Sequence, residues 1–135
     1  MQYDEARKML IARFEENIKA HLRGDVDYIL ADQAPDFWVM QEGEITYPTL
    51  TEQRERFTNY LANTTFHEYS SLMTPEIEFS DDGKSAWGKY RVRVRGETLN
   101  KDGSKTDLDF ICAWVWLFRL IDGRWLRVGE VSTWR

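Results

Sequence analysis

Apolar residues recur with a helical period at the start of the chain. Four of them stand four positions apart, with charged residues on the opposite face: Leu10, Phe14, Ile18 and Leu22. This spacing predicts an amphipathic helix over Asp4–Arg23. Asp4 is the expected N-cap of that helix and Gly24 its expected C-cap, because short acceptors favour helix starts and glycine favours helix ends.

Two further helices and a short strand are expected before residue 66. Asp25 is placed to cap a helix that runs from Val26 to about Gln33. The apolar run Phe37–Met40 predicts a short buried strand. A capping-box pattern at Thr49 predicts another helix, which continues through Leu61.

From Phe66 onward the period of apolar positions changes to two, which is typical of β-strands. The strands expected from this alternation are Phe66–Leu72, Glu76–Ser80, Lys84–Thr98, Thr106–Ile121 and Arg124–Trp134. Asp-Gly pairs at 82–83, 102–103 and 122–123 predict hairpin turns, since glycine adopts positive φ without penalty. The sequence therefore predicts one α+β domain over residues 1–135, shaped as a cone, with three N-terminal helices packed in a strongly curved, mostly antiparallel sheet. Such a cone leaves a hollow for a small ligand.

Three short motifs carry a resemblance to a known family. His21–Asp27 holds a Gly-Asp-x-Asp junction between two helices, Ala34–Phe37 opens a strand, and Asp122–Trp125 forms a closing Asp-Gly-x-Trp hairpin. In this order the motifs resemble the SnoaL-like branch of the nuclear transport factor 2-like superfamily over nearly the whole chain. The resemblance implies the cone fold. That superfamily holds cofactor-free isomerases, cyclases, dehydratases and epoxide hydrolases as well as non-catalytic binding and association modules, so the function must be argued from the site.

The last strand offers the candidate acid/base group. Alternation places Val128 and Glu130 on one face of it, together with Leu126, Ser132 and Trp134. Polyketide cyclases that this chain resembles carry an acid/base aspartate on this strand, and the resemblance implies that Glu130 is its counterpart. A carboxylate desolvated among indole rings suits proton transfer. The alternative is a structural ion pair between Glu130 and an arginine of a neighbouring strand.

The ketosteroid isomerase pattern is not reproduced. Alignment on the motifs puts Asn17 at that subfamily's tyrosine, Gln41 at its general-base aspartate and Trp116 near its oxyanion-hole aspartate. Asn and Gln are not useful bases at neutral pH, so we expect Asn17 and Gln41 to orient polar groups of a ligand instead. Aromatic residues make up 14% of the chain, more than a small core needs, and some should line the cavity. The expected cavity walls are Trp38, Tyr60, Trp114, Trp116 and Val128. His21 lies one helical turn beyond Asn17, so the two could share a face toward the hollow, and a dehydratase-like His/Asp pair is one alternative. No spacing demands it, so we expect His21 and His67 to be ordinary surface or core histidines.

Charge and composition narrow the expected partners. The formal net charge is −5, so nucleic acid is not an expected partner. A basic stripe on one strand is expected to be solvated or paired with Asp107 and Asp109: Lys89, Arg91, Arg93 and Arg95. The longest apolar stretch, Ile111–Phe118, is too short to cross a membrane, and the N-terminus lacks a signal region. One cysteine, Cys112, makes no internal disulfide, and no metal-ligand or phosphate-loop motif occurs. We expect a cytoplasmic protein with a small-molecule ligand and without metal or cofactor.

Both faces of the strand Phe110–Phe118 are apolar. One set faces the helices and the hollow, and the other has no helix left to cover it: Ile111, Ala113, Val115 and Leu117. Soluble monomers avoid such a large exposed apolar patch, so a homodimer packed sheet to sheet is expected. The alternative is that Trp134 and nearby loops fold over this stripe.

Overall fold

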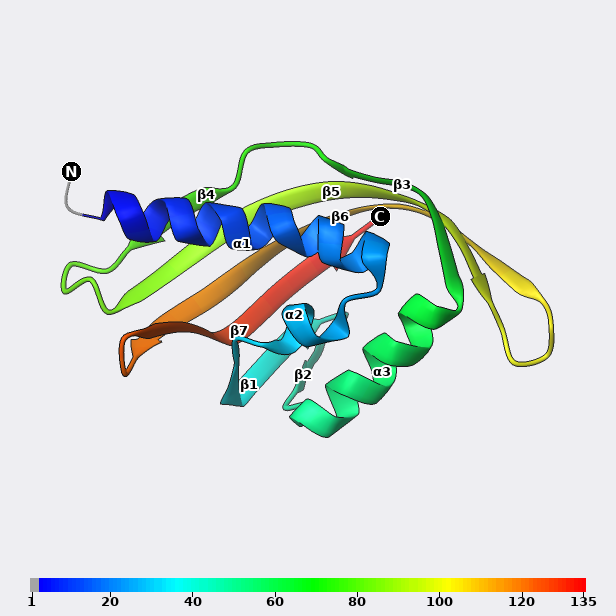
Figure 1. The fold of residues 1–135 in the computed structure, drawn as a ribbon, viewed down its shortest axis with the longest axis horizontal. Coiled ribbons are helices and arrows are strands. Elements are labelled where there is room, and N and C mark those ends of the chain that lie inside the picture. Colours follow the sequence, from blue (N-terminus) through cyan, green and yellow to red (C-terminus); the bar gives the residue numbers. More distant parts are fainter. Residues whose placement is uncertain (1–2) are drawn as a thin grey trace.

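The computed structural model describes residues 3–135, whose elements are labelled in Figure 1. The helices are α1 (Asp4–Arg23), α2 (Val26–Leu30) and α3 (Leu50–Ala62). The strands are β1 (Gln33–Gln41), β2 (Glu44–Thr46), β3 (Thr64–Ser71), β4 (Glu76–Phe79), β5 (Ser85–Leu99), β6 (Lys105–Ile121) and β7 (Arg124–Trp134). The strands form one seven-stranded sheet.

The sheet is mixed, open and strongly bent. Its strand order is β2-β1-β7-β6-β5-β3, with β4 beside β5. β1 and β7 run parallel, whereas the other pairings in the sheet are antiparallel. Figure 1 shows the sheet curving over α1, which lies along the concave side, with α3 standing at one end. The predicted α+β class and the curved sheet covered by N-terminal helices are confirmed.

Several predicted helix ends are confirmed in detail. Gly24 ends α1 with φ 71°, a left-handed conformation that a residue without Cβ adopts freely. The side chain of Asp25 accepts a hydrogen bond from the backbone N–H of Tyr28 and so begins α2. Thr49 and Glu52 form a complete capping box at the start of α3.

Other predicted ends are wrong. Tyr3, not Asp4, occupies the N-cap of α1, and Asp4 lies in the first turn, where a carboxylate interacts favourably with the helix dipole. α2 ends at Leu30 because β1 already begins at Gln33, four residues before the predicted strand. The hairpin between β1 and β2 turns at Glu42–Gly43, with φ 51° and 81°. That turn was not expected, because Asn-Gly and Asp-Gly are the usual sequences for it.

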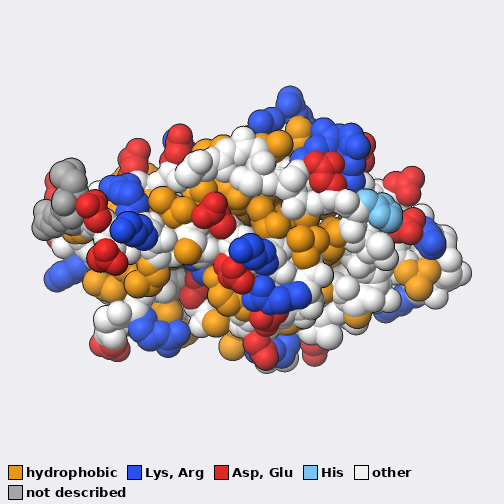
Figure 2. Space-filling model, turned by 45° about the horizontal axis from the view of Figure 1, so that its top comes forward, with side chains coloured by type: hydrophobic (Ala, Val, Ile, Leu, Met, Phe, Trp, Pro, Cys, Tyr) orange, Lys and Arg blue, Asp and Glu red, His pale blue; other side chains and the backbone are white. Residues whose placement is uncertain are grey.

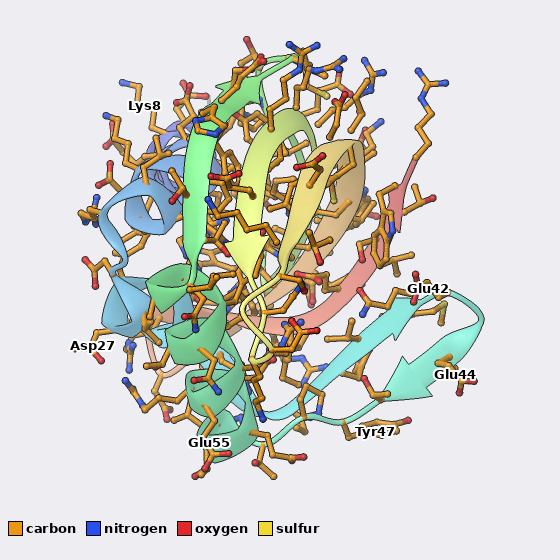
Figure 3. All side chains as sticks on the ribbon, turned by 90° about the vertical axis from the view of Figure 1, so that its right-hand side faces the viewer. Lys8, Asp27, Glu42, Glu44, Tyr47 and Glu55 are labelled. Carbon is orange, nitrogen blue, oxygen red and sulfur yellow. The ribbon has the colours of Figure 1, made fainter. Side chains whose placement is uncertain are left out.

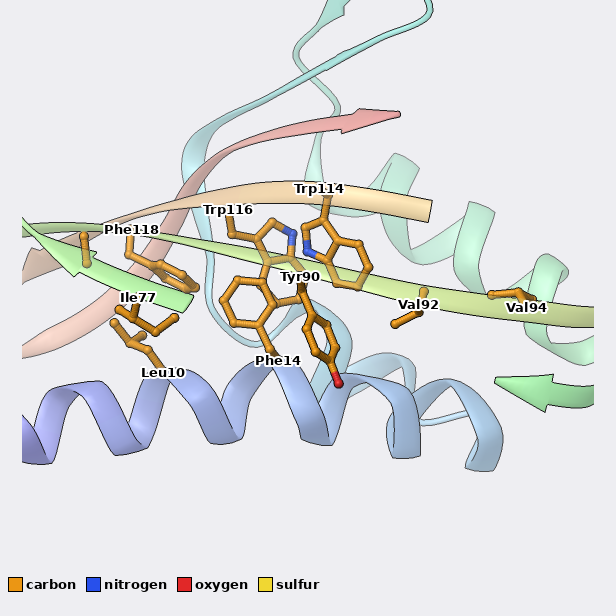
Figure 4. Close-up of a cluster of buried hydrophobic side chains, with 10 residues drawn as sticks. Leu10, Phe14, Ile77, Tyr90, Val92, Val94, Trp114, Trp116 and Phe118 are labelled. Carbon is orange, nitrogen blue, oxygen red and sulfur yellow. The ribbon is translucent and has the colours of Figure 1, made fainter. Parts of the chain in front are cut away.

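The main core lies between α1 and the concave faces of β5 and β6 (Figure 4). Phe14 of α1 is fully buried, stacks on Trp116 with 4.5 Å between ring centroids, and meets Phe118 edge-on. Gly88 of β5 makes room for it, since a Cβ there would lie 2.5 Å from the Phe14 ring and 2.6 Å from the side chain of Ile77. The bare backbone at Gly88 therefore lets α1 approach the sheet closely.

The convex face of the sheet is partly exposed. The apolar stripe on β6 is half-buried at each of its four positions: Ile111, Ala113, Val115 and Leu117. Beside it, Trp87 and Val131 are each 37% exposed. Trp134 does not fold over this stripe, because it lies opposite Cys112 in the β6–β7 register and lines the concave side. The helices in Figure 1 also lie on that concave side.

The basic stripe of β5 is largely neutralised by neighbouring strands. Arg93 lies 2.7 Å from the carboxylate of Asp109, the partner expected from the sequence. Arg95 lies 3.6 Å from Asp109 and 3.7 Å from Glu68. Figure 2 shows acidic and basic side chains intermingled on one face, with hydrophobic side chains between them. The ion pairs of Arg93 and Arg95 disfavour a polyanion-binding role for the stripe.

We expect Gly88→Ala to lower the free energy of unfolding by about 1–3 kcal/mol, because its methyl group must displace the Phe14 ring. Urea unfolding measures the change. Thr133→Ala, at an exposed position of β7, is the control and should alter stability by no more than about 0.5 kcal/mol. Equal stability of Gly88→Ala and wild type would show that the contact is not tight.

Candidate functional site

A cavity of about 410 Å³ lies between the concave sheet and the helices. Its lining comes from α1, α2, α3 and four strands: Asn17, His21, Ile29, Gln41, Gln53, Arg56, Phe57, Tyr60, Tyr69, Phe110, Cys112, Trp114, Trp116, Arg127, Glu130, Ser132 and Trp134. Among residues 3–135, Glu130 is the one carboxylate in this lining. Other acidic side chains near this end point outward in Figure 3, where Glu42, Glu44 and Glu55 lie at the periphery. The described lining thus combines seven Phe, Tyr and Trp residues with polar groups that include two arginines, Arg56 and Arg127, and a single acid.

Glu130 is held by an indole N–H. It lies directly opposite Trp116 in the β6–β7 register, so the two side chains share the concave face. Trp116 Nε1 donates a hydrogen bond to Glu130 Oε1 at 2.7 Å. Within residues 3–135, no arginine or lysine forms an ion pair with Glu130. The expected alternative, a structural ion pair with an arginine of a neighbouring strand, is therefore not formed in this part of the chain.

A β-bulge in β7 changes which residues face the cavity. Leu117 pairs with Gly129, but the next residue of β6, Phe118, pairs with Arg127, so Val128 is the extra residue. Arg127 consequently faces the interior and is only 4% exposed. The simple alternation expected from the sequence, with Val128 on the face of Glu130 and Arg127 on the other, is wrong at this point.

The buried arginine forms an ion pair with Asp32, which it shares with Arg13. Arg127 Nε donates to Asp32 Oδ1 at 2.6 Å, and Arg13 Nε of α1 donates to Asp32 Oδ2 at 2.7 Å. Desolvation would raise the pKa of Asp32, but the charges and hydrogen bonds of Arg127 and Arg13 outweigh it and hold that pKa below its usual value. Asp32 therefore stays ionised and forms ion pairs with both arginines. Glu130 pairs with neither of them in the described chain and lines the cavity.

The two arginines also pack on the indole that holds Glu130. The guanidinium carbon of Arg13 lies 4.8 Å from the Trp116 ring centroid, and that of Arg127 lies 5.1 Å from it. Cations over an indole face are attracted to its π-electrons. Together with Phe14, these contacts fix the ring plane of Trp116 and so the direction of its N–H.

Six of the sequence-predicted site residues are brought together in the cavity wall: Asn17, Gln41, Tyr60, Trp114, Trp116 and Glu130. Gln41 Oε1 accepts a hydrogen bond from Ser132 Oγ at 3.0 Å. Asn17 is 5% exposed, and its side-chain oxygen accepts from Arg13. Tyr60 of α3 meets Phe66 edge-on. Gln41 and Ser132 lie on the same face as Glu130, because Val39 pairs with Glu130 and each residue lies two positions further along its strand.

Trp38 and Val128 do not line the cavity. Trp38 covers the backbone of Gly129, where a Cβ would lie 2.4 Å from the indole ring. Gly129 pairs with Leu117 of the outer stripe, so this contact is on the convex face of the sheet. Val128 is 8% exposed and is the additional residue of the bulge. The placement of Val128 follows from the bulge, which the local sequence does not reveal. Alternation along β1, by contrast, already puts Trp38 on the face opposite Gln41, so the two could not both face the cavity.

His21 lies in the cavity wall together with Asn17, one helical turn away, as their spacing allows. His21 is 9% exposed, and its Nδ1 lies 2.8 Å from the carbonyl oxygen of Asn17. Burial lowers the pKa of His21 to about 4, with the charges of Arg13 and Arg56 acting in the same direction. The imidazole is therefore neutral at pH 7, and its Nδ1 carries the proton because the partner is a carbonyl.

Two further lining groups are also held neutral. Burial raises the pKa of the Cys112 thiol to about 11, and the charge of Glu130 adds to this. Burial likewise raises the pKa of Tyr69. Alternation along Phe110–Phe118 already places Cys112 on the face of Trp114 and Trp116, which is the signal that could have found it.

Other classes of site receive no support from residues 3–135. They hold no group of three or more His, Cys, Asp and Glu side chains arranged for a metal ion. None of the helices in this range has the length and apolar character needed to span a membrane.

Comparison with protein-family models gives no match, and comparison with curated proteins gives none either. Solved structures are similar. A nuclear transport factor 2-like protein from Cytophaga hutchinsonii is 15% identical with a TM-score of 0.71, over 94% of this chain and 96% of that one. A putative Ca/calmodulin-dependent kinase II association domain from Exiguobacterium sibiricum is 12% identical with a TM-score of 0.72, over 100% and 97%. A putative ketosteroid isomerase from Shewanella frigidimarina is 16% identical with a TM-score of 0.58, over 90% and 92%.

These likenesses define the class of fold. The chain has the nuclear transport factor 2-like cone, shared by proteins named for isomerase chemistry and for association. At these identities the likeness extends to the fold and not to the function.

We expect wild-type protein to lose stability relative to His21→Asn as the pH falls from 6.5 to about 4. Because the folded pKa of His21 is lowered, only the unfolded chain binds a proton in this window, so acid favours unfolding. The full difference is about 3 kcal/mol, reached near the folded pKa. Urea unfolding at pH 7, 5.5 and 4 checks it, and a stability difference independent of pH would contradict a buried neutral imidazole.

Proposed function

We propose that this protein binds a small apolar or aromatic metabolite in the cavity and that Glu130 transfers a proton to or from it without a cofactor. The observation that carries this proposal is the environment of Glu130. Its carboxylate lies in an aromatic wall, is fixed by the Trp116 N–H, and has no cationic partner within residues 3–135. A carboxylate that is positioned but not neutralised is suited to general acid/base work.

The geometry assigns separate roles to the two carboxylate oxygens. Oε1 of Glu130 accepts the Trp116 hydrogen bond, whereas Oε2 has no hydrogen-bond partner within the described chain. Oε2 is therefore the atom that would take or give a proton. Cyclisation, isomerisation and dehydration all require such a transfer. Gln41, Ser132 and Asn17 would orient polar groups of the ligand, while Tyr60 and Trp114 would exclude water.

We infer that the SnoaL-like branch is the part of the superfamily to which this site is most similar. The motifs in His21–Asp27, Ala34–Phe37 and Asp122–Trp125 support it, as does an acid on the last strand. Gln41 in place of the isomerase base argues against ketosteroid isomerase chemistry in its usual form.

The competing function is a non-catalytic association or binding module. Its support is the likeness to a putative kinase association domain and the half-exposed apolar stripe on β6. The two functions differ in what Glu130 does, which makes Glu130 the residue to test.

We expect Glu130→Gln to abolish turnover but not binding. Gln keeps an oxygen acceptor for the Trp116 N–H and cannot transfer a proton, so the rate should fall about 10²–10⁴-fold with affinity nearly unchanged. Aromatic ketones and phenols are screened by their effect on tryptophan fluorescence, and those that bind are followed for product by mass spectrometry. Glu55→Gln, an outward-facing carboxylate on α3, is the control. Turnover equal to wild type in Glu130→Gln would contradict the acid/base role, and binding without turnover in wild type would favour the non-catalytic function.

We also propose a homodimer that buries the convex face of the sheet. The stripe of Ile111, Ala113, Val115 and Leu117 supports it, with Trp87 and Val131 extending the apolar area. A contiguous apolar surface of this kind is commonly covered by a second copy in an isologous contact.

We expect sedimentation of wild-type protein at micromolar concentration to give a species of twice 16.1 kDa. Val115→Glu should yield the 16.1 kDa species with an unchanged far-ultraviolet circular dichroism spectrum, since a charge in the buried interface is costly while the helices lie elsewhere. Leu99→Glu, at an exposed apolar position near the tip of the β5–β6 hairpin, should leave the dimer intact. A 16.1 kDa wild-type species would refute the dimer.

A further inference from the structure

Arg56 of α3 is a cation of the cavity wall that has no carboxylate partner within residues 3–135. Its side chain lines the cavity and is exposed, so it lies where the cavity opens to solvent. The other arginine of the lining, Arg127, is buried and paired with Asp32. Arg56 is therefore the lining cation whose charge remains available to a ligand.

The acids of α3 itself are directed away from Arg56. Glu52 stands one turn earlier, at the spacing from which a helix commonly supplies a counter-ion. Its carboxylate instead accepts a hydrogen bond from the backbone N–H of Thr49 in the capping box. Glu55, the residue before Arg56, points outward in Figure 3. The start of the helix is thus built so that the guanidinium group is left without an acid of its own.

Two contacts hold the guanidinium group in place. Arg56 Nε donates to Gln53 Oε1 at 3.2 Å, and the guanidinium carbon lies 4.7 Å from the centroid of the Phe57 ring. Both partners also line the cavity. The N–H groups of Nη1 and Nη2 have no acceptor in the described part of the chain. Arg56 is therefore positioned by its neighbours and keeps donors free.

Gln53 adds a second donor beside this cation. Because an arginine only donates, the contact with Arg56 identifies Oε1 of Gln53 as the acceptor and leaves Nε2 as the other end of the amide. Gln53 is 5% exposed, and its Nε2 has no acceptor among residues 3–135. This nitrogen is not fully enclosed by protein, in contrast to the indole nitrogen of Trp114. Since Gln53 lines the cavity, a ligand can reach the amide as well as the guanidinium group.

The positive charge of Arg56 acts on other groups of the cavity. Burial lowers the pKa of His21, and the charge of Arg56 acts in the same direction. Burial raises the pKa of Tyr60, and the charge of Arg56 opposes that rise. A bound anion would be attracted by the same charge, whereas Glu130 lies on β7 and forms no ion pair with Arg56.

We propose that Arg56 and Gln53 bind a carboxylate, so that the cavity takes an aromatic or apolar acid whose anionic group stays at the opening. The planar guanidinium group matches the two oxygens of a carboxylate, and the amide N–H supplies a further donor. The ring of the acid would enter the cavity toward Trp114 and Glu130. This assignment rests on the proposed function in one respect, namely that a small molecule enters the cavity.

The test compares acids with neutral amides of the same shape. Benzoic acid is paired with benzamide and 2-naphthoic acid with 2-naphthamide, and isothermal titration calorimetry with the full chain at pH 7 measures all of them. Wild type, Arg56→Gln and Arg54→Gln are compared. Arg54 lies on the same helix, pairs with Asp27 at 2.6 Å and is not part of the lining, so its variant controls for the loss of one positive charge. Wild type and Arg54→Gln should bind an acid about tenfold more tightly than its amide, and Arg56→Gln should bind the two alike.

Gln53→Glu gives an independent measurement at the same place. A carboxylate at this position would pair with Arg56 and repel an anionic ligand. The affinity for the acid should therefore fall about tenfold or more, while the affinity for the amide changes little. An unchanged affinity for the acid in this variant would overturn the assignment.

The remaining outcomes separate this site from the proposed function. Equal affinity for acid and amide in wild type overturns the carboxylate site, while ligand binding in the cavity stands. An acid preference that survives in Arg56→Gln overturns the role of Arg56. Failure of both acids to bind wild type overturns the carboxylate site alone, because the screen of ketones and phenols tests the proposed function separately.

Discussion

The carboxylate of Asp32 is the point on which the architecture of the site depends. It bridges Arg13 of α1 and Arg127 of β7, and both guanidinium groups also donate to the carbonyl oxygen of Ile29 in α2. The first helix, the second helix and the last strand are therefore tied together by one buried ion network. Two buried cations without that carboxylate would be strongly destabilising, because neither could be hydrated.

The same network reaches the cavity through an aromatic ring. Arg13 and Arg127 pack on Trp116, and the Trp116 N–H sets the position of Glu130. A charge cluster that joins the helices to the sheet thus also orients the acidic group of the cavity. Arg13, Arg127 and Trp116 therefore both stabilise the fold and position the carboxylate of Glu130.

The parts of the fold that depend on local sequence could be predicted, and those that depend on strand pairing could not. Gly24 and the capping box at Thr49 are local signals, and the structure agrees with them. The bulge at Val128 arises from how β7 pairs with β6 and turns Arg127 inward, which no alternation of residues reveals. Trp38 is a different case, because alternation along β1 places it on the face opposite Gln41, and it lies on the convex side against Gly129. Glu130 lies beyond the bulge and lines the cavity, although Leu126 and Val128, the residues from which its face was inferred, do not.

Alternate residues of β7 lie on the two faces of the sheet, the convex face and the face that lines the cavity. Gly129 and Val131 belong to the convex side, where Trp38 covers the backbone, while Glu130 and Ser132 alternate with them toward the cavity. A second subunit on the convex face and a ligand in the cavity would both contact this strand, from opposite faces of the sheet. Any free-energy coupling between the two events is reciprocal by thermodynamic necessity. The concentration of subunits would then set the apparent affinity for the ligand, and occupancy of the cavity would in turn set how readily the subunits separate.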